Sequence, residues 1–205
     1  MTDSTDRRVL RSRRLLADAL MDLIVEKGYD DITIQEIADR ADLNRATFYL
    51  HYAGKEELLL AGLAQRFDEL VAAMDVVEFA GAPWDNIAYD LLLFRHVADH
   101  AALYKVLFGA RGLGLVMHQV ITYMAGVIER DIRTIIPQAE QDNERIPISA
   151  HFFAGALFAI IKWWLDNDMP VPPEAMAHLS DRLCTHGAVD VLGQWSQTEA
   201  AVTSA

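Results

Sequence analysis

Side chains that can contact a nucleic acid recur at regular spacing in one short N-terminal segment. Arg45, Thr47, Tyr49 and His51 occupy every second position, and Lys55 follows four residues later. A guanidinium can pair bidentately with guanine O6 and N7, and a threonine can contact a thymine methyl or a phosphate. Longer polar side chains and lysines reach the phosphate backbone. The set is typical of a short helix that enters the major groove of DNA.

A helix is predicted just before this segment by two independent start signals. Thr33 and Glu36 have the spacing of a capping box, and Ile32 and Ile37 have that of a hydrophobic staple. We therefore expect a helix of about nine residues that begins at Ile34. Its first amides, near Thr33, are also suited to a phosphate.

A turn and a second short helix should follow. Asn44 can cap a helix that ends near Tyr52. Ala46 and either Phe48 or Leu50 are expected to anchor this helix, which leaves the polar side chains exposed. Two short helices joined by such a turn form a helix-turn-helix, in which the second helix reads DNA.

Residues 32–58, ITIQEIADRADLNRATFYLHYAGKEEL, closely resemble the TetR family of bacterial transcriptional regulators. The resemblance extends over about residues 8–70 and includes the preceding helix, which should end at Gly28. Together, the resemblance and the helix-turn-helix reasoning predict a set of DNA-binding residues. These are Thr33, Asn44, Arg45, Ala46, Thr47, Tyr49, His51 and Lys55.

Two positions depart from the family pattern. Asp42 stands where the family usually has a glycine in the turn, and aspartate tolerates the left-handed backbone region better than most residues. Gly54 stands where the family often has serine or threonine, which removes one phosphate ligand. Gly54 can still cap the next helix, which we expect to continue to about residue 77.

The net charge of the chain, −12, speaks against nucleic-acid binding only as an average over 205 residues. Residues 1–55 hold nine basic and ten acidic residues, a net charge of −1, and the rest of the chain carries −11. Five arginines between Arg7 and Arg14 can contact the DNA backbone beside the helix-turn-helix. The acidic part would keep the body of the protein away from DNA.

Helical periodicity dominates the whole chain, which predicts an all-α fold of about nine helices. Residues 1–55 are expected to form the helix-turn-helix domain, and residues 80–192 a ligand-binding and dimerisation domain. Residues 193–205 read as a tail that frays. The further helices are expected at about 85–100, 101–108, 113–136, 147–166 and 173–192.

The resemblance implies that the last two helices form a four-helix bundle across a homodimer, although they are also compatible with ordinary intrachain core. Residues 152–161 are apolar all round, as a helix covered on both sides should be. The interface residues predicted on these helices are Phe152, Gly155, Ala156, Ala159, Met176, Leu179, Leu183 and Gly187.

A small effector is expected to bind among aromatic and sulfur-bearing side chains of the second domain. The predicted pocket residues are Phe94, His100, Tyr104, Phe108, Met117, Tyr123 and Met124, with Trp163 or Trp164 as a wall. By the same resemblance, we expect a repressor that binds a near-palindromic operator as a homodimer and is released by a largely apolar effector. An activator, or a regulator controlled by a protein partner, is the alternative.

Other classes of protein find little support in the sequence. His96 and His100 have a spacing that can bind a metal from one helix face, but nothing accompanies them, so we expect no metal and no cofactor. No motif for an enzyme appears. A single cysteine, Cys184, excludes an internal disulfide, and the longest apolar run is ten residues, so a cytoplasmic protein without a membrane span is expected.

Overall fold

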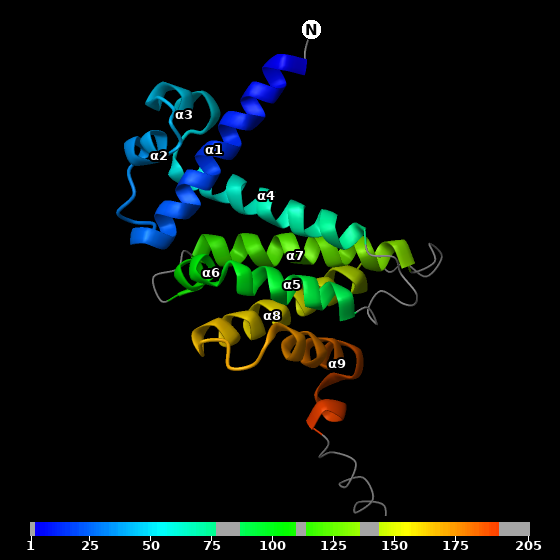
Figure 1. Cartoon of the computed structure of the whole chain (residues 1–205). Helices are drawn as coiled ribbons and strands as arrows, with labels where there is room; N and C mark the ends of the chain where they lie inside the picture. The colour runs from blue at the N-terminus through cyan, green and yellow to red at the C-terminus, as the bar shows by residue number, and fades with distance from the viewer. Residues whose placement is uncertain (1–2, 77–86, 110–113, 136–143, 193–205) are drawn as a thin grey trace, which may run out of the picture. The chain divides into compact units, whose positions relative to one another are not determined.

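A computed structural model describes residues 3–76, 87–109, 114–135 and 144–192 (Figure 1). All the regular secondary structure in these ranges is helical, which confirms the all-α prediction. The helices are α1 (Asp3–Lys27), α2 (Ile34–Arg40), α3 (Arg45–His51), α4 (Lys55–Asp75), α5 (Ile87–Asp99), α6 (Ala101–Phe108), α7 (Gly114–Ile135), α8 (Arg145–Asp166) and α9 (Pro173–Leu192). The expected tail, residues 193–205, lies outside the described residues.

The chain forms two compact units whose boundary differs from the one we expected. The first unit comprises residues 1–69 and 101–119, and the second comprises residues 70–100 and 120–205. Helix α6 and the start of α7 therefore group with the N-terminal helices. Two of the longest helices, α4 and α7, each contribute to both units.

The first unit is built on the buried face of α1. Leu16, Leu20 and Ile24 of this face are fully buried, as are Ile37 of α2 and Phe48 of α3. Both α2 and α3 have only seven residues, and a helix that short is not stable by itself in water. Their packing on α1, visible at the upper left of Figure 1, is therefore what maintains them.

Helix α6 belongs to the first unit because it buries one face and contacts α1. Leu103, Tyr104, Leu107 and Phe108 are buried, and the rings of Tyr104 and Phe108 stack with their centroids 5.3 Å apart. Burial raises the pKa of the Tyr104 phenol, and the positive charge of Arg66 offsets part of this rise. Tyr104 therefore stays neutral and serves the core.

The second unit packs α5 against α9 and buries one face of α8. Phe94 of α5 meets Trp164 of α8 edge to face, with ring centroids 5.6 Å apart. The indole Nε1 of Trp164 donates to the carbonyl of Val171 at 2.8 Å, so the buried polar atom is paired. This bond ties the α8–α9 turn, where Asp168 and Met169 have positive φ, to the core.

Within one chain α8 is covered on one side, and the expected cover of its other side by a second copy stays a prediction. Ile148, Phe152 and Trp163 are 69%, 70% and 55% exposed. Residues 145–166 are also long and apolar enough to cross a membrane by length and composition alone, a test that the core helices of soluble proteins pass too.

Candidate nucleic-acid interface

The start of α3 is set by Asn44, as predicted. Its Oδ1 accepts from the backbone N–H of Thr47 at 2.7 Å and from the Thr47 hydroxyl at 2.9 Å. This N-cap supplies one of the acceptors that the first turn of a helix lacks. It also ties down the Thr47 side chain, so this hydroxyl enters any DNA contact with a defined orientation.

The turn between α2 and α3 closes through its backbone. Asp42 adopts a φ of 53°, the left-handed conformation we expected it to tolerate in place of glycine. The N–H of Leu43 then donates to the carbonyl of Ala38 at 2.9 Å. The turn therefore retains its geometry without the glycine of the family pattern.

Phe48 alone of the three candidate anchors holds α3. Its side chain is fully buried against Tyr52, with ring centroids 6.0 Å apart. Ala46 is exposed and Leu50 is 80% exposed, so the expectation that either of them anchors the helix was wrong. Arg13 of α1 fixes the other end of α3, because its Nε donates to the Tyr52 hydroxyl at 3.1 Å and its guanidinium lies over that ring.

The predicted contact residues of α3 divide into an exposed and a half-buried group. Arg45, Ala46 and Tyr49 are exposed, whereas Thr47 and His51 are half-buried. Arg45 Nη2 donates to the Tyr49 hydroxyl at 3.2 Å, and the guanidinium lies 5.5 Å from the centre of that ring. The two side chains thus support each other on one side of the helix.

Lys55 does not project as we expected. Its Nζ donates to the carbonyls of Tyr29, Asp30 and Ile32 at 2.8, 2.9 and 2.9 Å and lies over the Tyr29 ring. An ammonium has three donors, and all three are used here. This corrects the expectation of an outward phosphate ligand, because the side chain holds the turn before α2 against the start of α4.

The capping box of α2 is confirmed, but it occupies the amide that we expected to be available to a phosphate. Glu36 accepts from the Thr33 N–H at 2.9 Å and from the Thr33 hydroxyl at 2.8 Å, while the Glu36 N–H donates to Thr33 Oγ1. An ion pair with Lys27 and these bonds from Thr33 lower the pKa of Glu36 to about 2. A carboxylate therefore lies at this helix start.

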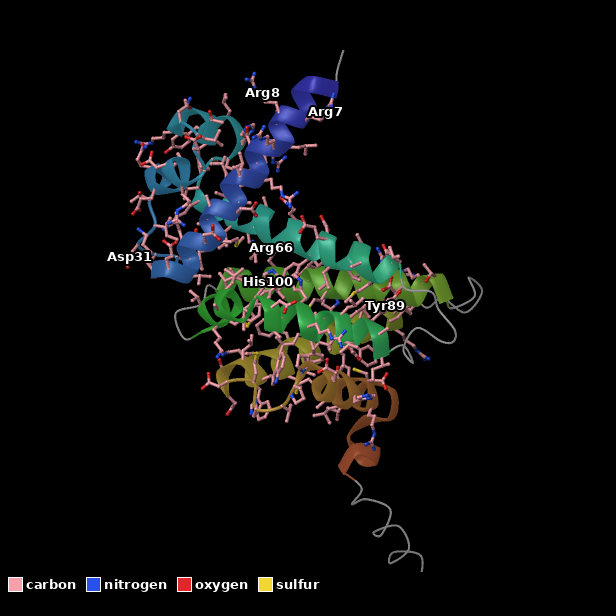
Figure 2. The ribbon with its side chains drawn as sticks, viewed as in Figure 1. Arg7, Arg8, Asp31, Arg66, Tyr89 and His100 are labelled. Atoms are coloured by element: carbon pink, nitrogen blue, oxygen red, sulfur yellow. The ribbon has the colours of Figure 1, made fainter. Side chains whose placement is uncertain are left out.

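The N-terminal turns of α1 add positive charge to the first unit. Figure 2 shows Arg7 and Arg8 on these turns, and both are exposed, as are Arg11 and Arg14. Arg13 has a different role, because it donates to the hydroxyl of Tyr52 and so helps to position α3. Sequence reasoning missed this role because the two residues lie 39 positions apart.

The predicted pocket residues are divided between the two compact units. Phe94 meets Trp164 in the second unit, whereas Tyr104 stacks on Phe108 in the first. Met117 is 47% exposed, and Trp163 is 55% exposed. The remaining predicted residues, His100, Tyr123 and Met124, are half-buried in the second unit.

The predicted interface residues also divide. Phe152, Ala156, Ala159 and Leu179 are exposed, and Gly155 is half-buried. Met176 is buried, and α9 packs against α5, so its assignment to the interface was wrong. Leu183 is half-buried. Gly187 lies in the last part of α9, outside the residues whose burial is described.

His96 of α5 and His100, directly after α5, lie with their rings in contact and tilted against each other. Their ring centroids lie 4.5 Å apart, and Nδ1 of His100 lies 2.8 Å from the His96 carbonyl. Among the described residues, no three side chains of the types that bind metals form a group that could hold an ion.

Comparison with known proteins decides the family. Residues 16–61 match the family described as bacterial regulatory proteins, tetR family, and residues 84–186 match a transcriptional regulator C-terminal region of TetR type. This chain belongs to the TetR family of transcriptional regulators. The helix-turn-helix formed by α2 and α3 lies within the first of these matches.

Curated relatives agree with this assignment. The chain is 44% identical over 177 residues to the uncharacterized HTH-type regulator YxbF of Bacillus subtilis, a match covering 84% of this chain and 44% of that protein. It is 30% identical over 97 residues to the dhaKLM operon activator DhaS of Lactococcus lactis, covering 47% and 49%. Each match thus spans less than half the length of the relative.

A solved structure shows the same fold. FadR from Bacillus subtilis, solved in complex with stearoyl-CoA, has a TM-score of 0.60 and 18% identity to this chain. The match covers 84% of this chain and 97% of FadR. At this identity the likeness speaks for the architecture of the helices.

Proposed function

We propose that this TetR-family regulator is a repressor that binds a near-palindromic operator as a homodimer and is released by a small-molecule effector. The observation that supports it most is α3 itself, a short helix capped at Asn44, anchored by Phe48 and exposed on its outer face. Two such helices related by a twofold axis would read half-sites about one DNA turn, roughly 34–36 Å, apart. A cytoplasmic location follows from binding to bacterial DNA.

The sequence-reading role is carried in this proposal by Arg45. Arg45→Ala should cost about 1–3 kcal/mol of operator binding and relax the preference at one base position, because a bidentate contact to guanine is lost. Duplexes selected from a random pool by the parent and by the variant measure both effects. Arg95→Ala is the matched control, since it removes an equally charged, exposed side chain whose partner is Glu174 of the second unit.

Two results would contradict this role of Arg45. If Arg45→Ala selects the same sequences with the same affinity as the parent, α3 is not the reading helix. If Arg95→Ala weakens binding as much as Arg45→Ala does, the effect of both is one of overall charge.

The effector is proposed to be largely apolar, because the second unit buries aromatic side chains such as Phe94 and Trp164. The FadR structure with stearoyl-CoA supports fatty acyl thioesters as the first compounds to test. An effector should raise the melting temperature of the protein and lower its affinity for the selected duplex. If no compound in the screen has both effects, control by a protein partner is favoured.

Activation of transcription is the second candidate function, and the match to DhaS, an activator, is what favours it. A reporter gene behind the selected operator distinguishes the two. Loss of the protein raises expression for a repressor and lowers it for an activator.

A further inference from the structure

Leu50 lies at the centre of the outer face of α3. Successive residues of an α-helix are turned by about 100°, so the direction opposite the buried Phe48 falls midway between Ala46 and Leu50. Arg45 and Tyr49 lie to one side of that direction, and Thr47 lies to the other. Ala46 and Leu50 are four residues apart and therefore share one face.

The exposure of the side chains agrees with this geometry. Leu50 is 80% exposed and Ala46 is exposed, whereas Tyr49 is 48% exposed and Thr47 is half-buried. An exposed leucine by itself needs no explanation. Here, however, it occupies the direction in which a helix anchored through Phe48 would advance into the major groove.

The chemistry of the groove then limits what Leu50 can contact. Most atoms on the major-groove edges of base pairs are hydrogen-bond donors or acceptors, and covering them with an isobutyl group leaves them without partners. The exception is the C5-methyl group of thymine, which is apolar. We propose that Leu50, with the methyl group of Ala46 beside it, reads the 5-methyl group of a thymine in each half-site.

The neighbouring side chains leave this contact open. Arg45 and Tyr49 pair with each other along the side of the helix, and Thr47 bonds back to Asn44. The small Ala46 lets the helix backbone approach the base edges closely. The polar residues thus border an apolar strip that is one side chain wide, and this strip fits a single methyl group.

Uracil in place of thymine tests the inference, because the exchange removes only the methyl group. The inference rests on the proposed DNA binding, so the parent first selects its duplex from a random pool. Each thymine of a half-site is then replaced by uracil in turn. At one position in each half-site, we expect the parent to bind about 5- to 20-fold more weakly.

The variant Leu50→Ala should bind the thymine and uracil duplexes equally, at about the affinity of the parent for the uracil duplex. Leu10→Ala is the matched control, since Leu10 is a 64% exposed leucine on the N-terminal turns of α1. Like the parent, this control should bind the uracil duplex more weakly than the thymine duplex. The experiment on the parent uses no variant, so it does not depend on how Leu50→Ala folds.

Two outcomes overturn the inference while leaving DNA binding intact. One is a parent chain that binds every uracil duplex as tightly as the thymine duplex. The other is a Leu50→Ala variant that still loses affinity on the uracil exchange, because the methyl group is then read elsewhere. A parent chain that selects no sequence overturns the proposed function, and the inference with it.

Discussion

Lys55 illustrates at the residue scale how a side chain of the right type and spacing for DNA can serve the fold instead. Its ammonium donates to three carbonyls between α1 and α2 and lies over the Tyr29 ring. The same carbonyls would otherwise need other donors or water. The start of α4 and the start of α2 are therefore held together by one side chain.

This placement makes Lys55 a stability residue. Lys55→Met should lower the free energy of unfolding by about 1–3 kcal/mol, because bonds from a charged donor to part-buried carbonyls are lost. Urea denaturation measures the change. Lys162→Met is the control, since Lys162 forms an exposed ion pair with Asp166 and should change stability little. If Lys55→Met is as stable as the parent but binds DNA more weakly, Lys55 is a phosphate ligand as the sequence predicted.

At the scale of elements, two seven-residue helices depend on their caps. Thr33→Ala should cost about 0.5–2 kcal/mol of stability, because the N-cap oxygen of α2 is lost. Thr134→Ala, which removes an exposed hydroxyl bonded to the Asp131 carbonyl within α7, should cost less. Thermal unfolding compares the two. Equal losses would mean that packing on α1, rather than the capping box, determines where α2 begins.

The packing of α5 on α9 introduces a dependence on pH. Burial, together with the charge of Asp181, raises the pKa of the Asp90 carboxyl to about 7, although the Ser180 hydroxyl offsets part of the rise. An unfolded aspartate titrates near 3.9. Between about pH 4 and 7 the folded chain therefore retains a proton that the unfolded chain releases, and stability falls as the pH rises through this window.

Asp90→Asn removes this titration. Its melting temperature should fall less than that of the parent between pH 5 and pH 8, because the amide resembles the protonated carboxyl and does not ionise. Asp99→Asn, at an exposed position of the same helix, should follow the parent. If the parent and Asp90→Asn change alike with pH, Asp90 is already ionised in the folded chain.

At the scale of the whole molecule, one face of α8 has no covering partner among the residues that the structure describes. Ile148, Phe152, Ala156 and Trp163 follow one another along this face, and all four are exposed. A contiguous apolar strip of this kind on a protein surface marks an interaction site. A second copy of the same chain would cover it, as the proposed homodimer requires.

Phe152→Asp should therefore weaken the dimer by more than about 2 kcal/mol, roughly 30-fold in dissociation constant, because a charge replaces a buried aromatic anchor. Sedimentation equilibrium measures the dissociation, and operator affinity should fall with it. Val76→Asp is the control, with an 81% exposed apolar side chain directly after the end of α4. A parent chain that sediments as a monomer at all concentrations would rule out this face as a dimer interface.

The bounds of the elements followed closely from the sequence. The end of α1 at Gly28 with a φ of 80°, the capping box of α2 and the cap at Asn44 were all predicted. Each depends on residues within about four positions of one another, and side-chain spacing specifies such interactions directly. The left-handed Asp42 belongs to the same class.

The directions in which individual side chains point could not be predicted from the sequence. Phe48 and Leu50 are both large and apolar, and only the packing of α3 decides that the first is buried and the second exposed. Trp163 and Trp164 differ in the same way on α8. Met176 faces the core because α9 packs on α5, a contact between residues far apart in the chain.

By itself, then, the sequence determined the helices, their caps, the helix-turn-helix and the regulatory class, because local spacing and a long ungapped motif carry that information. Only the tertiary structure decided that Lys55 holds a turn, that α6 groups with the N-terminal helices and that Leu50 lies at the centre of the outer face of α3. These features depend on which surfaces pack together. Packing is a property of distant residues in contact, and the local pattern of the chain does not contain it.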